Sequence, residues 1–249
     1  MTAATRLNVK EKLIVALDVE TADGARDIVS RLREHVGMFK INTQLFTAAG
    51  PDFVREVVGG GSQVFLDLKY HDIPATVANA CREAVRLGVA IFNVHASGGA
   101  EMLRRAAETT RETAAREGLR KPHLIAVTVL TSADASVLAE TGVAADSVES
   151  QVVRLARLAA ECGLDGVVAS PHEIAPVRGA VGRRDFLLVT PGVRPSGVAH
   201  DDQRRVMTPG EAIAAGADYL VVGRAILRTP DMVRAAREMV EEMEQAASK

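Results

Sequence analysis

Short runs rich in β-branched residues alternate with helix-length amphipathic segments along the whole chain. This rhythm predicts parallel strands joined by crossover helices. The expected strands are Ile14–Asp18, Met38–Ile41, Val64–Lys69, Phe92–Ala96, Leu124–Leu130, Gly166–Ala169, Phe186–Thr190 and Tyr219–Gly223. A last helix is expected near Asp231–Gln245. Eight such units without a break in composition favour a closed (β/α)8 TIM barrel, an α/β fold, as a single domain over residues 1–249.

The ends of several helices can also be read from the sequence. Two helix starts combine a capping hydroxyl, a proline and a glutamate, and they are Ser170-Pro171-His172-Glu173 and Thr208-Pro209-Gly210-Glu211. Gly88, Gly163 and Gly216 follow helical stretches at positions where a left-handed C-cap residue is wanted. The alternation of strand and helix is therefore supported from both ends of the helices.

Composition and charge exclude several classes of function. The 249 residues include 30 basic and 32 acidic side chains, so the net charge of −2 gives no reason to expect nucleic acid or an anionic membrane as a partner. Two tyrosines, six phenylalanines and no tryptophan argue against stacking platforms for single-stranded nucleic acid. No apolar run reaches the length of a signal peptide or of a membrane span. We therefore expect a cytoplasmic protein.

Cysteine and histidine positions predict no metal site. Cys81 and Cys162 occur singly in helix-like segments, where we expect them to pack in the core. The six histidines show neither H-x-H nor H-E-x-x-H spacing, which makes a zinc site improbable. His71 and His95 stand near strand ends, and we interpret both as packing or supporting hydrogen-bond residues.

Polar residues gather at the carboxyl ends of the expected strands, where the functional loops of a parallel barrel begin. In chain order these residues are Asp18, Lys40, Asp67, Lys69, Thr131-Ser132 and Gly223-Arg224. Any one of them could be a strand end that meets water. Together they make this end of the barrel the expected location of the site.

The third strand carries the sharpest signal. In Val64–Lys69, the two-residue period places Asp67 and Lys69 on one face, and Asp72 follows three residues later. Two nearby carboxylates would keep the Lys69 amine charged, which suits proton delivery to a basic carbon better than Schiff-base chemistry. The alternative is a cluster of salt bridges that only seals the end of the barrel.

The C-terminal quarter predicts a phosphate site. Pro191-Gly192-Val193-Arg194 and Gly223-Arg224 follow the last two strands, where many barrels hold a phosphate with backbone N–H groups and a cation. An arginine can bind two phosphate oxygens at once. The segment Pro195–Arg205 between them lacks apolar periodicity, and we interpret it as a lid over bound substrate.

The segment Phe65-Leu66-Asp67-Leu68-Lys69-Tyr70-His71-Asp72-Ile73-Pro74-Ala75-Thr76 resembles the signature of the orotidine 5'-phosphate decarboxylase family. Further matches occur in the family's order, and they are Asp18, Phe39-Lys40, Thr128–Ser132, Pro191–Arg194, Gln203 and Val221–Arg224. The resemblance extends from the first expected strand to the eighth. It implies a cofactor-free enzyme that converts orotidine 5'-monophosphate to UMP and CO2, the last step of de novo pyrimidine nucleotide synthesis.

The resemblance also assigns roles to individual residues. It implies that Lys69 donates a proton to C6 of the pyrimidine and that Asp67 lies beside the substrate carboxylate. Asp18 and Lys40 would bind ribose hydroxyls, Lys40 would also complete an alternating Lys-Asp-Lys-Asp network, and Thr131 would contact the pyrimidine. The implied phosphate ligands are Arg194, Gln203, Gly223 and Arg224. Asp72 and Thr76 would reach into the neighbouring subunit's site, which makes a homodimer the expected functional unit.

Two alternatives stay open on the sequence. A metal-dependent sugar-phosphate decarboxylase or aldolase of the same superfamily would share the D-x-K-x-x-D pattern. Such an enzyme is expected to carry a metal-binding acidic residue in the second strand, where Lys40 stands instead. The other alternative is a non-catalytic phosphate-binding barrel. Retention of Lys69 and both neighbouring aspartates speaks against it.

Overall fold

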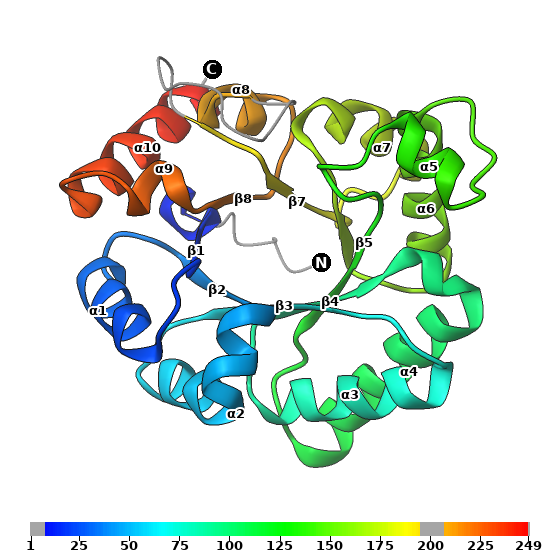
Figure 1. Ribbon diagram of the computed structural model, residues 1–249, viewed down its shortest axis with the longest axis horizontal. Helices are drawn as coiled ribbons and strands as arrows, with labels where there is room; N and C mark the ends of the chain where they lie inside the picture. Colours follow the sequence, from blue (N-terminus) through cyan, green and yellow to red (C-terminus); the bar gives the residue numbers. More distant parts are fainter. Residues whose placement is uncertain (1–7, 195–206, 249) are drawn as a thin grey trace.

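The computed structural model describes residues 8–194 and 207–248. Eight parallel strands form a closed barrel in sequence order, with β8 paired back to β1 (Figure 1). The strands are β1 Leu13–Ala16, β2 Met38–Asn42, β3 Val64–Tyr70, β4 Ile91–His95, β5 His123–Val127, β6 Gly166–Val168, β7 Leu187–Pro191 and β8 Tyr219–Val222. The predicted α/β TIM barrel is confirmed.

All eight predicted strands are present, and only their ends differ from the prediction. The largest difference is in β5, which ends at Val127 rather than Leu130. The neighbouring β6 is only three residues long, and its last residue pairs with Val127. Past this point the side chain of Thr128, rather than the backbone ladder, donates a hydrogen bond to the Val168 carbonyl at 2.9 Å. The apolar run therefore outlasts the strand because β5 has no partner left on that side.

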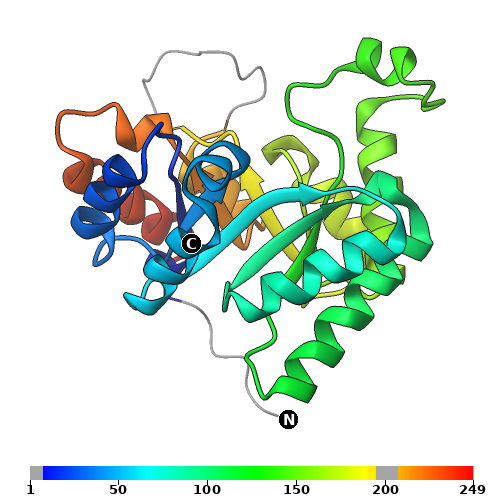
Figure 2. The ribbon, with the colours of Figure 1, turned by 60° about the horizontal axis from the view of Figure 1, so that its bottom comes forward.

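Helices surround the barrel between successive strands (Figure 1). They are α1 Ala22–Leu32, α2 Thr43–Gly59, α3 Pro74–Arg86, α4 Gly99–Glu117, α5 Ala135–Glu140, α6 Val148–Glu161, α7 Ile174–Val181, α8 Pro209–Ala214, α9 Arg224–Leu227 and α10 Met232–Ala247. The short α5 was not predicted, and its segment stands away from the barrel wall (Figure 2). The side chain of Asp134 caps it by accepting hydrogen bonds from the Ser136 and Val137 N–H groups.

The predicted helix ends are confirmed, except that the Ser170 hydroxyl makes no capping hydrogen bond within the described residues. At α8, Thr208 Oγ1 accepts from Glu211 N at 3.2 Å, while the Glu211 carboxylate accepts from Thr208 N at 2.9 Å. At the other predicted start, the carboxylate of Glu173 accepts from Ser170 N at 2.8 Å, and a short 3-10 turn precedes α7. The three predicted C-cap glycines, Gly88, Gly163 and Gly216, all have positive φ. The last predicted helix begins at Met232 with Asp231 as its cap.

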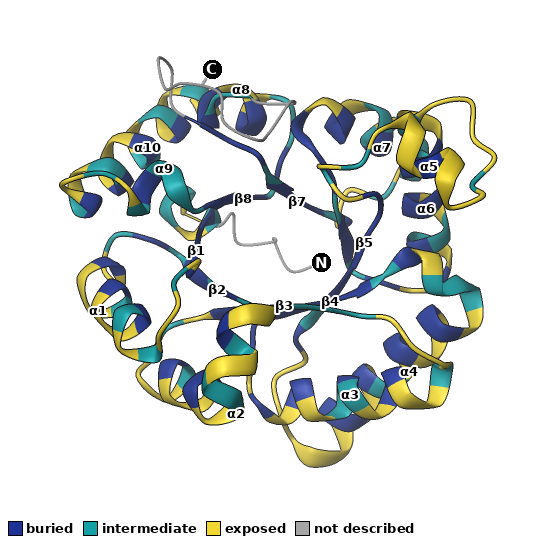
Figure 3. Cartoon of the chain, viewed as in Figure 1, coloured by how far each residue is buried: buried dark blue, intermediate teal, exposed yellow. Residues whose placement is uncertain are grey.

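Strand residues divide into two buried layers by their two-residue period. Leu13, Val15 and Leu17 of the first strand region pack outward against the helices. The alternate residues fill the inside of the barrel, in a cluster that includes Ile14, Met38, Phe65, Ile91, Ile125, Val189, Tyr219 and Val221. Burial follows this arrangement, with buried strands and helices exposed only on their outer faces (Figure 3). Cys81 and Cys162 are both buried, as predicted.

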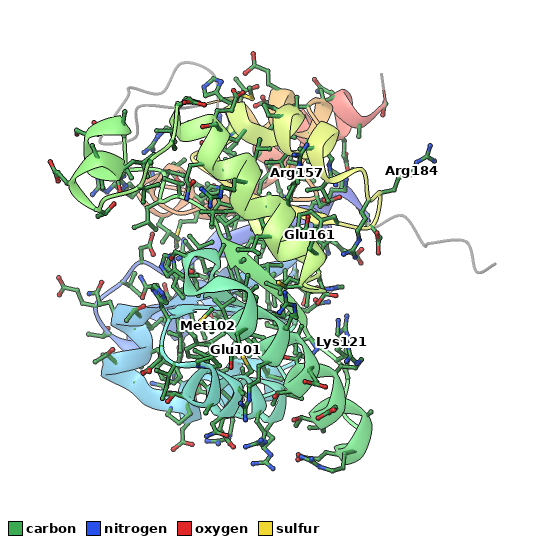
Figure 4. The ribbon with its side chains drawn as sticks, turned by 90° about the vertical axis from the view of Figure 1, so that its right-hand side faces the viewer. Glu101, Met102, Lys121, Arg157, Glu161 and Arg184 are labelled. Carbon is green, nitrogen blue, oxygen red and sulfur yellow. The ribbon has the colours of Figure 1, made fainter. Side chains whose placement is uncertain are left out.

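The outer faces of the helices are charged. Figure 4 shows Arg157 and Glu161 on α6 and Glu101 at the start of α4, all of them exposed. The inner faces of the same helices are buried, for example at Met102 of α4. Within residues 8–194 and 207–248, no helix is both long enough and apolar enough to cross a membrane.

Candidate active site

On each of the strands β1 to β4, the row of side chains that faces the inside of the barrel changes from apolar to polar towards the carboxyl end. On β1, Ile14 and Ala16 are followed by Asp18, and on β3, Phe65 is followed by Asp67 and Lys69. The polar members of these rows are Asp18, Lys40, Asn42, Asp67, Lys69, Asn93 and His95. They stand at the carboxyl ends of the strands, which is the functional end of this fold.

A cavity of about 260 Å³ opens at this end of the barrel. Its apolar lining includes Phe65, Val127 and Val168. Most of the predicted site residues also line it, and these are Asp18, Lys40, Asp67, Lys69, Thr131, Arg194, Gly223 and Arg224. The closed sheet has therefore brought together residues that lie more than two hundred positions apart in the sequence.

Acidic and basic groups alternate along one wall of this cavity. The ammonium nitrogen of Lys69 lies 2.7 Å from Asp67 Oδ1, and that of Lys40 lies 3.1 Å from Asp67 Oδ2. Lys40 also lies 3.7 Å from Asp18 Oδ1, which accepts a hydrogen bond from the Asn42 amide. The side chains of Asp67 and Lys40 are 11% and 12% exposed, whereas that of Lys69 is 33% exposed. Of the two lysines, Lys69 is thus the one that is open to a bound molecule, and at the other end of the row the side chain of Asp18 is 44% exposed.

The environment of Asp67 keeps this carboxyl ionised. Burial acts to raise the pKa of Asp67, but the two ammonium groups and the hydrogen bonds from Lys69 and Asn93 outweigh it. The pKa of Asp67 therefore lies below its ordinary value. A fixed negative charge in turn holds the Lys69 ammonium at the cavity wall.

The backbone at Lys69 is unusual. Lys69 has φ +53°, a left-handed conformation that no other non-glycine residue of the described chain adopts. The pairing of β3 with β4 is irregular between Leu66 and Tyr70, which is the segment that carries Lys69. A lysine in this conformation costs on the order of 1–2 kcal/mol, and such strain clusters at functional sites.

Asp72 and Thr76 do not join this cluster within one chain. Both residues are exposed and neither lines the cavity. A carboxylate oxygen of Asp72 accepts a hydrogen bond from the next residue, the N–H of Ile73, at 2.6 Å. The expectation that Asp67 and Asp72 of the same segment flank Lys69 is therefore wrong for a single chain. The reason is local, because β3 continues to Tyr70 and the tight turn before α3 directs Asp72 outward.

Two arginines and a glycine that follow β7 and β8 also line the cavity. Arg194 is 8% exposed, and its Nε has no hydrogen-bond partner among the described residues. Gly223 lies so close to Asp18 that a Cβ there would be 2.8 Å from a carboxylate oxygen, so a larger residue would displace Asp18. Arg224 opens α9 beside it. Gln203 and the predicted lid Pro195–Arg205 lie outside the described residues.

His71 and His95 lie side by side near Lys69. Their ring centroids are 5.5 Å apart. Burial, followed by the neighbouring charges of His71 and Lys69, lowers the pKa of His95. Within the described residues, no group of three or more His, Cys, Asp or Glu side chains is arranged to hold a metal ion.

Two site residues, Asn42 and Asn93, were missed in the sequence. Asn42 caps α2 by accepting from Leu45 N at 2.8 Å and also donates to Asp18 at 3.0 Å. Asn93 is completely buried and donates to Asp67 at 2.7 Å. Its signal was available, because an asparagine is unusual inside a strand and Asn93 falls on the inward row of Ile91.

The fold and this charged cavity define a (β/α)8-barrel enzyme with its active site at the carboxyl ends of the strands. A family model, described as orotidine 5'-phosphate decarboxylase / HUMPS family, matches residues 11–239. The chain belongs to this family.

Several known proteins are similar over almost the whole chain. An orotidine 5'-phosphate decarboxylase from Syntrophotalea carbinolica is 56% identical over 234 residues, covering 94% of this chain and 95% of that protein. The enzyme of the same name from Moorella thermoacetica is 54% identical, covering 96% of this chain and 94% of that protein. A crystal structure of orotidine 5'-phosphate decarboxylase from Lactobacillus acidophilus matches with a TM-score of 0.82 at 35% identity. That match covers 93% of this chain and 98% of the solved one.

Proposed function

We propose that the protein decarboxylates orotidine 5'-monophosphate to UMP and CO2, without a cofactor, and that Lys69 donates the proton to C6. The observation that carries this proposal is the alternating chain of charges that ends in the Lys69 ammonium, 2.7 Å from Asp67. The similarity to relatives named orotidine 5'-phosphate decarboxylase, at more than half identity, supports the choice of substrate.

The proposed reaction has a simple balance of bonds and charges. The bond between C6 and the carboxylate carbon breaks, CO2 leaves, and the electron pair stays on C6. No neighbouring carbonyl can delocalise this carbanion, so a preorganised positive charge must stabilise it. The Lys69 ammonium supplies that charge and then transfers a proton to C6, which leaves a neutral amine that solvent protonates again. Asp67, ionised and beside the substrate carboxylate, fixes the ammonium in place.

The remaining site residues bind the rest of the substrate in this proposal. Asp18 and Lys40 contact the ribose hydroxyls, and Thr131 contacts the pyrimidine. The phosphate ligands are Arg194, Gln203, Gly223 and Arg224. Arg194 is buried and its Nε has no partner among the residues that the structure describes, which suits an anion that arrives with the substrate. Phosphate binding then lowers the barrier to the extent that it organises the site for the transition state.

A homodimer would complete each site. Asp72 and Thr76 face away from their own cavity, and between them Ile73 is 66% exposed. A large exposed apolar side chain next to outward-facing functional residues fits a surface that a second subunit covers. We therefore propose that Asp72 and Thr76 reach the neighbouring subunit's substrate. The cytoplasmic location expected from the sequence stays a prediction.

The metal-dependent alternative is less favourable for an electrostatic reason. The ammonium of Lys40 lies between Asp18 and Asp67, at 3.7 Å and 3.1 Å from their oxygens. A divalent cation bound by these two carboxylates would lie next to that ammonium, and the repulsion between them is strong in a buried site. Binding of a sugar phosphate through a metal at this position would therefore require Lys40 to move.

The test follows the absorbance of the pyrimidine when EDTA-treated protein is mixed with orotidine 5'-monophosphate. Rapid loss of absorbance without added metal is the expected result. If the protein does not act on orotidine 5'-monophosphate but turns over a sugar phosphate after magnesium is added, the assignment passes to the metal-dependent relatives. No turnover of either substrate would favour the non-catalytic barrel.

A further inference from the structure

Asn93 joins the two parts of the charged pair. Its side chain accepts a hydrogen bond from the backbone N–H of Lys69 at 2.8 Å through Oδ1. The same side chain donates through Nδ2 to Asp67 Oδ1 at 2.7 Å. Asp67 Oδ1 therefore receives both the Lys69 ammonium and the Asn93 amide. One amide group contacts the backbone of the lysine and the carboxylate that pairs with its side chain.

The position of Asn93 is unfavourable unless these bonds are made. It lies in the middle of β4 and is 0% exposed, between Phe92 and Val94, which are also fully buried. Burying an amide without partners costs free energy, and asparagine is depleted in strands. The strand itself does not need this side chain, because β4 pairs with β5 in a regular register through Asn93. The side chain is therefore explained by what it holds on β3.

Asn93 also compensates for the irregular pairing at Lys69. The register between β3 and β4 shifts within the segment that carries Lys69, and its φ is +53°. A buried backbone N–H that lacks a ladder partner must find another acceptor. Asn93 Oδ1 is that acceptor. Its hydrogen bond favours the backbone conformation from which the Lys69 side chain turns back to Asp67.

We propose that Asn93 is a positioning residue for the reaction assigned to Lys69, and this inference rests on the proposed function. It sets the strained backbone of Lys69 and the orientation of the Asp67 carboxylate at the same time. Asn93 does not line the cavity, so it acts through these two residues and not on the substrate. Loss of its amide should impair turnover and leave the binding of phosphate and ribose nearly unchanged.

The first experiment compares Asn93→Ala with the wild type and with Thr110→Val. Thr110 is an equally buried polar residue, but it lies on the outer helix α4, where its hydroxyl donates to Ala106 O and its side chain also interacts with Cys81. We expect Asn93→Ala to lower kcat by about 10- to 100-fold, the range typical of residues that orient catalytic groups, with KM changed less than about threefold. Thr110→Val should retain wild-type kcat. Thermal unfolding and circular dichroism verify that each variant is folded.

The second experiment separates the two hydrogen bonds. In Asn93→Asp, an ionised carboxylate can still accept from Lys69 N, but it cannot donate to Asp67. Two adjacent carboxylates take up a shared proton at a raised apparent pKa, and the protonated form regains a donor. The activity of Asn93→Asp relative to wild type should therefore rise several-fold when the pH is lowered from about 8 to about 5.5. A residue with only a packing role would give a constant ratio.

The outcomes distinguish this inference from the proposed function. A folded Asn93→Ala variant with kcat within about threefold of wild type, or with a loss confined to KM, overturns the positioning role. If the alanine variant does not fold, a constant ratio in Asn93→Asp overturns it instead. Lys69→Ala is measured alongside. Near-normal activity of Lys69→Ala would refute the proton donor itself, whereas an inactive Lys69→Ala with an unaffected Asn93→Ala would refute only the inference on Asn93.

Discussion

The two ends of the barrel use the same kinds of charged residues for different purposes. At the amino ends of the strands, the Arg178 guanidinium pairs with Asp218 and donates to the Phe186 and Gly216 carbonyls. The Asp218 carboxylate also accepts from Leu188 N at 2.8 Å. These groups are occupied by one another and by the backbone.

At the carboxyl ends, Lys69 and Arg194 are only partly paired within the described residues. In the described part of the chain, Lys69 has one carboxylate partner, and its side chain is 33% exposed at the cavity. Arg194 is buried, and its Nε has no hydrogen-bond partner within residues 8–194 and 207–248. The difference indicates that saturated ion pairs at one end stabilise the barrel, while incompletely paired ones at the other end are available to a substrate.

The largest effect should come from the carboxyl end. Lys69→Ala removes the proposed proton donor and its charge, so kcat should fall by more than about 1,000-fold. Stability should change little, because the side chain that is removed is partly exposed and Asp67 keeps Lys40 and Asn93 as partners. Decarboxylation of orotidine 5'-monophosphate and a thermal unfolding curve check both parts. Near-normal turnover would contradict the mechanism and remove the contrast between the two ends.

The opposite pattern is expected at the amino end. Arg178→Ala leaves two backbone carbonyls and Asp218 without their partner, which should destabilise the protein by about 1–3 kcal/mol. The remaining folded enzyme should keep its kcat. Denaturant unfolding measures the first effect and a steady-state assay the second. Arg55→Ala is the matched control, since the Arg55 side chain is 59% exposed and pairs with the exposed residue Asp52, and it should cost less than about 1 kcal/mol.

A smaller effect concerns pH. Because burial and neighbouring positive charge lower the pKa of His95, the unfolded chain binds a proton at this residue more readily than the native protein. The stability that the neutral His95 contributes is present above the ordinary histidine pKa of about 6.5 and is lost as the pH falls through the native value. His95→Gln should therefore weaken the dependence of the unfolding temperature on acid, by about a degree or two.

The measurement compares unfolding temperatures at neutral and mildly acid pH. His172→Gln, at an exposed histidine, should leave the wild-type slope unchanged. An identical slope in wild type and His95→Gln would show that His95 does not contribute to acid sensitivity. Either result sharpens the comparison between the two ends of the barrel. It shows whether a titrating group at the carboxyl end, His95, limits stability in acid.

Much of the site could be predicted because its signals are local. Asp67 and Lys69 share a face through the two-residue period, and the structure places their charged atoms 2.7 Å apart. Asn93 is different. Its two partners are 24 and 26 residues away along the chain, and only the pairing of β3 with β4 brings them together. No local pattern could assign those bonds.

The sequence by itself determined the eight strands, the ends of the helices and the end of the barrel where chemistry gathers. These depend on periodicity, capping residues and strand-end polarity, which act over a few neighbouring residues. The tertiary structure decided which groups meet: Lys40 between Asp18 and Asp67, Asn93 behind Lys69, and Asp72 turned outward. The physical reason is that a side chain's face is set by its own strand, whereas its neighbours are set by the register and closure of the whole sheet.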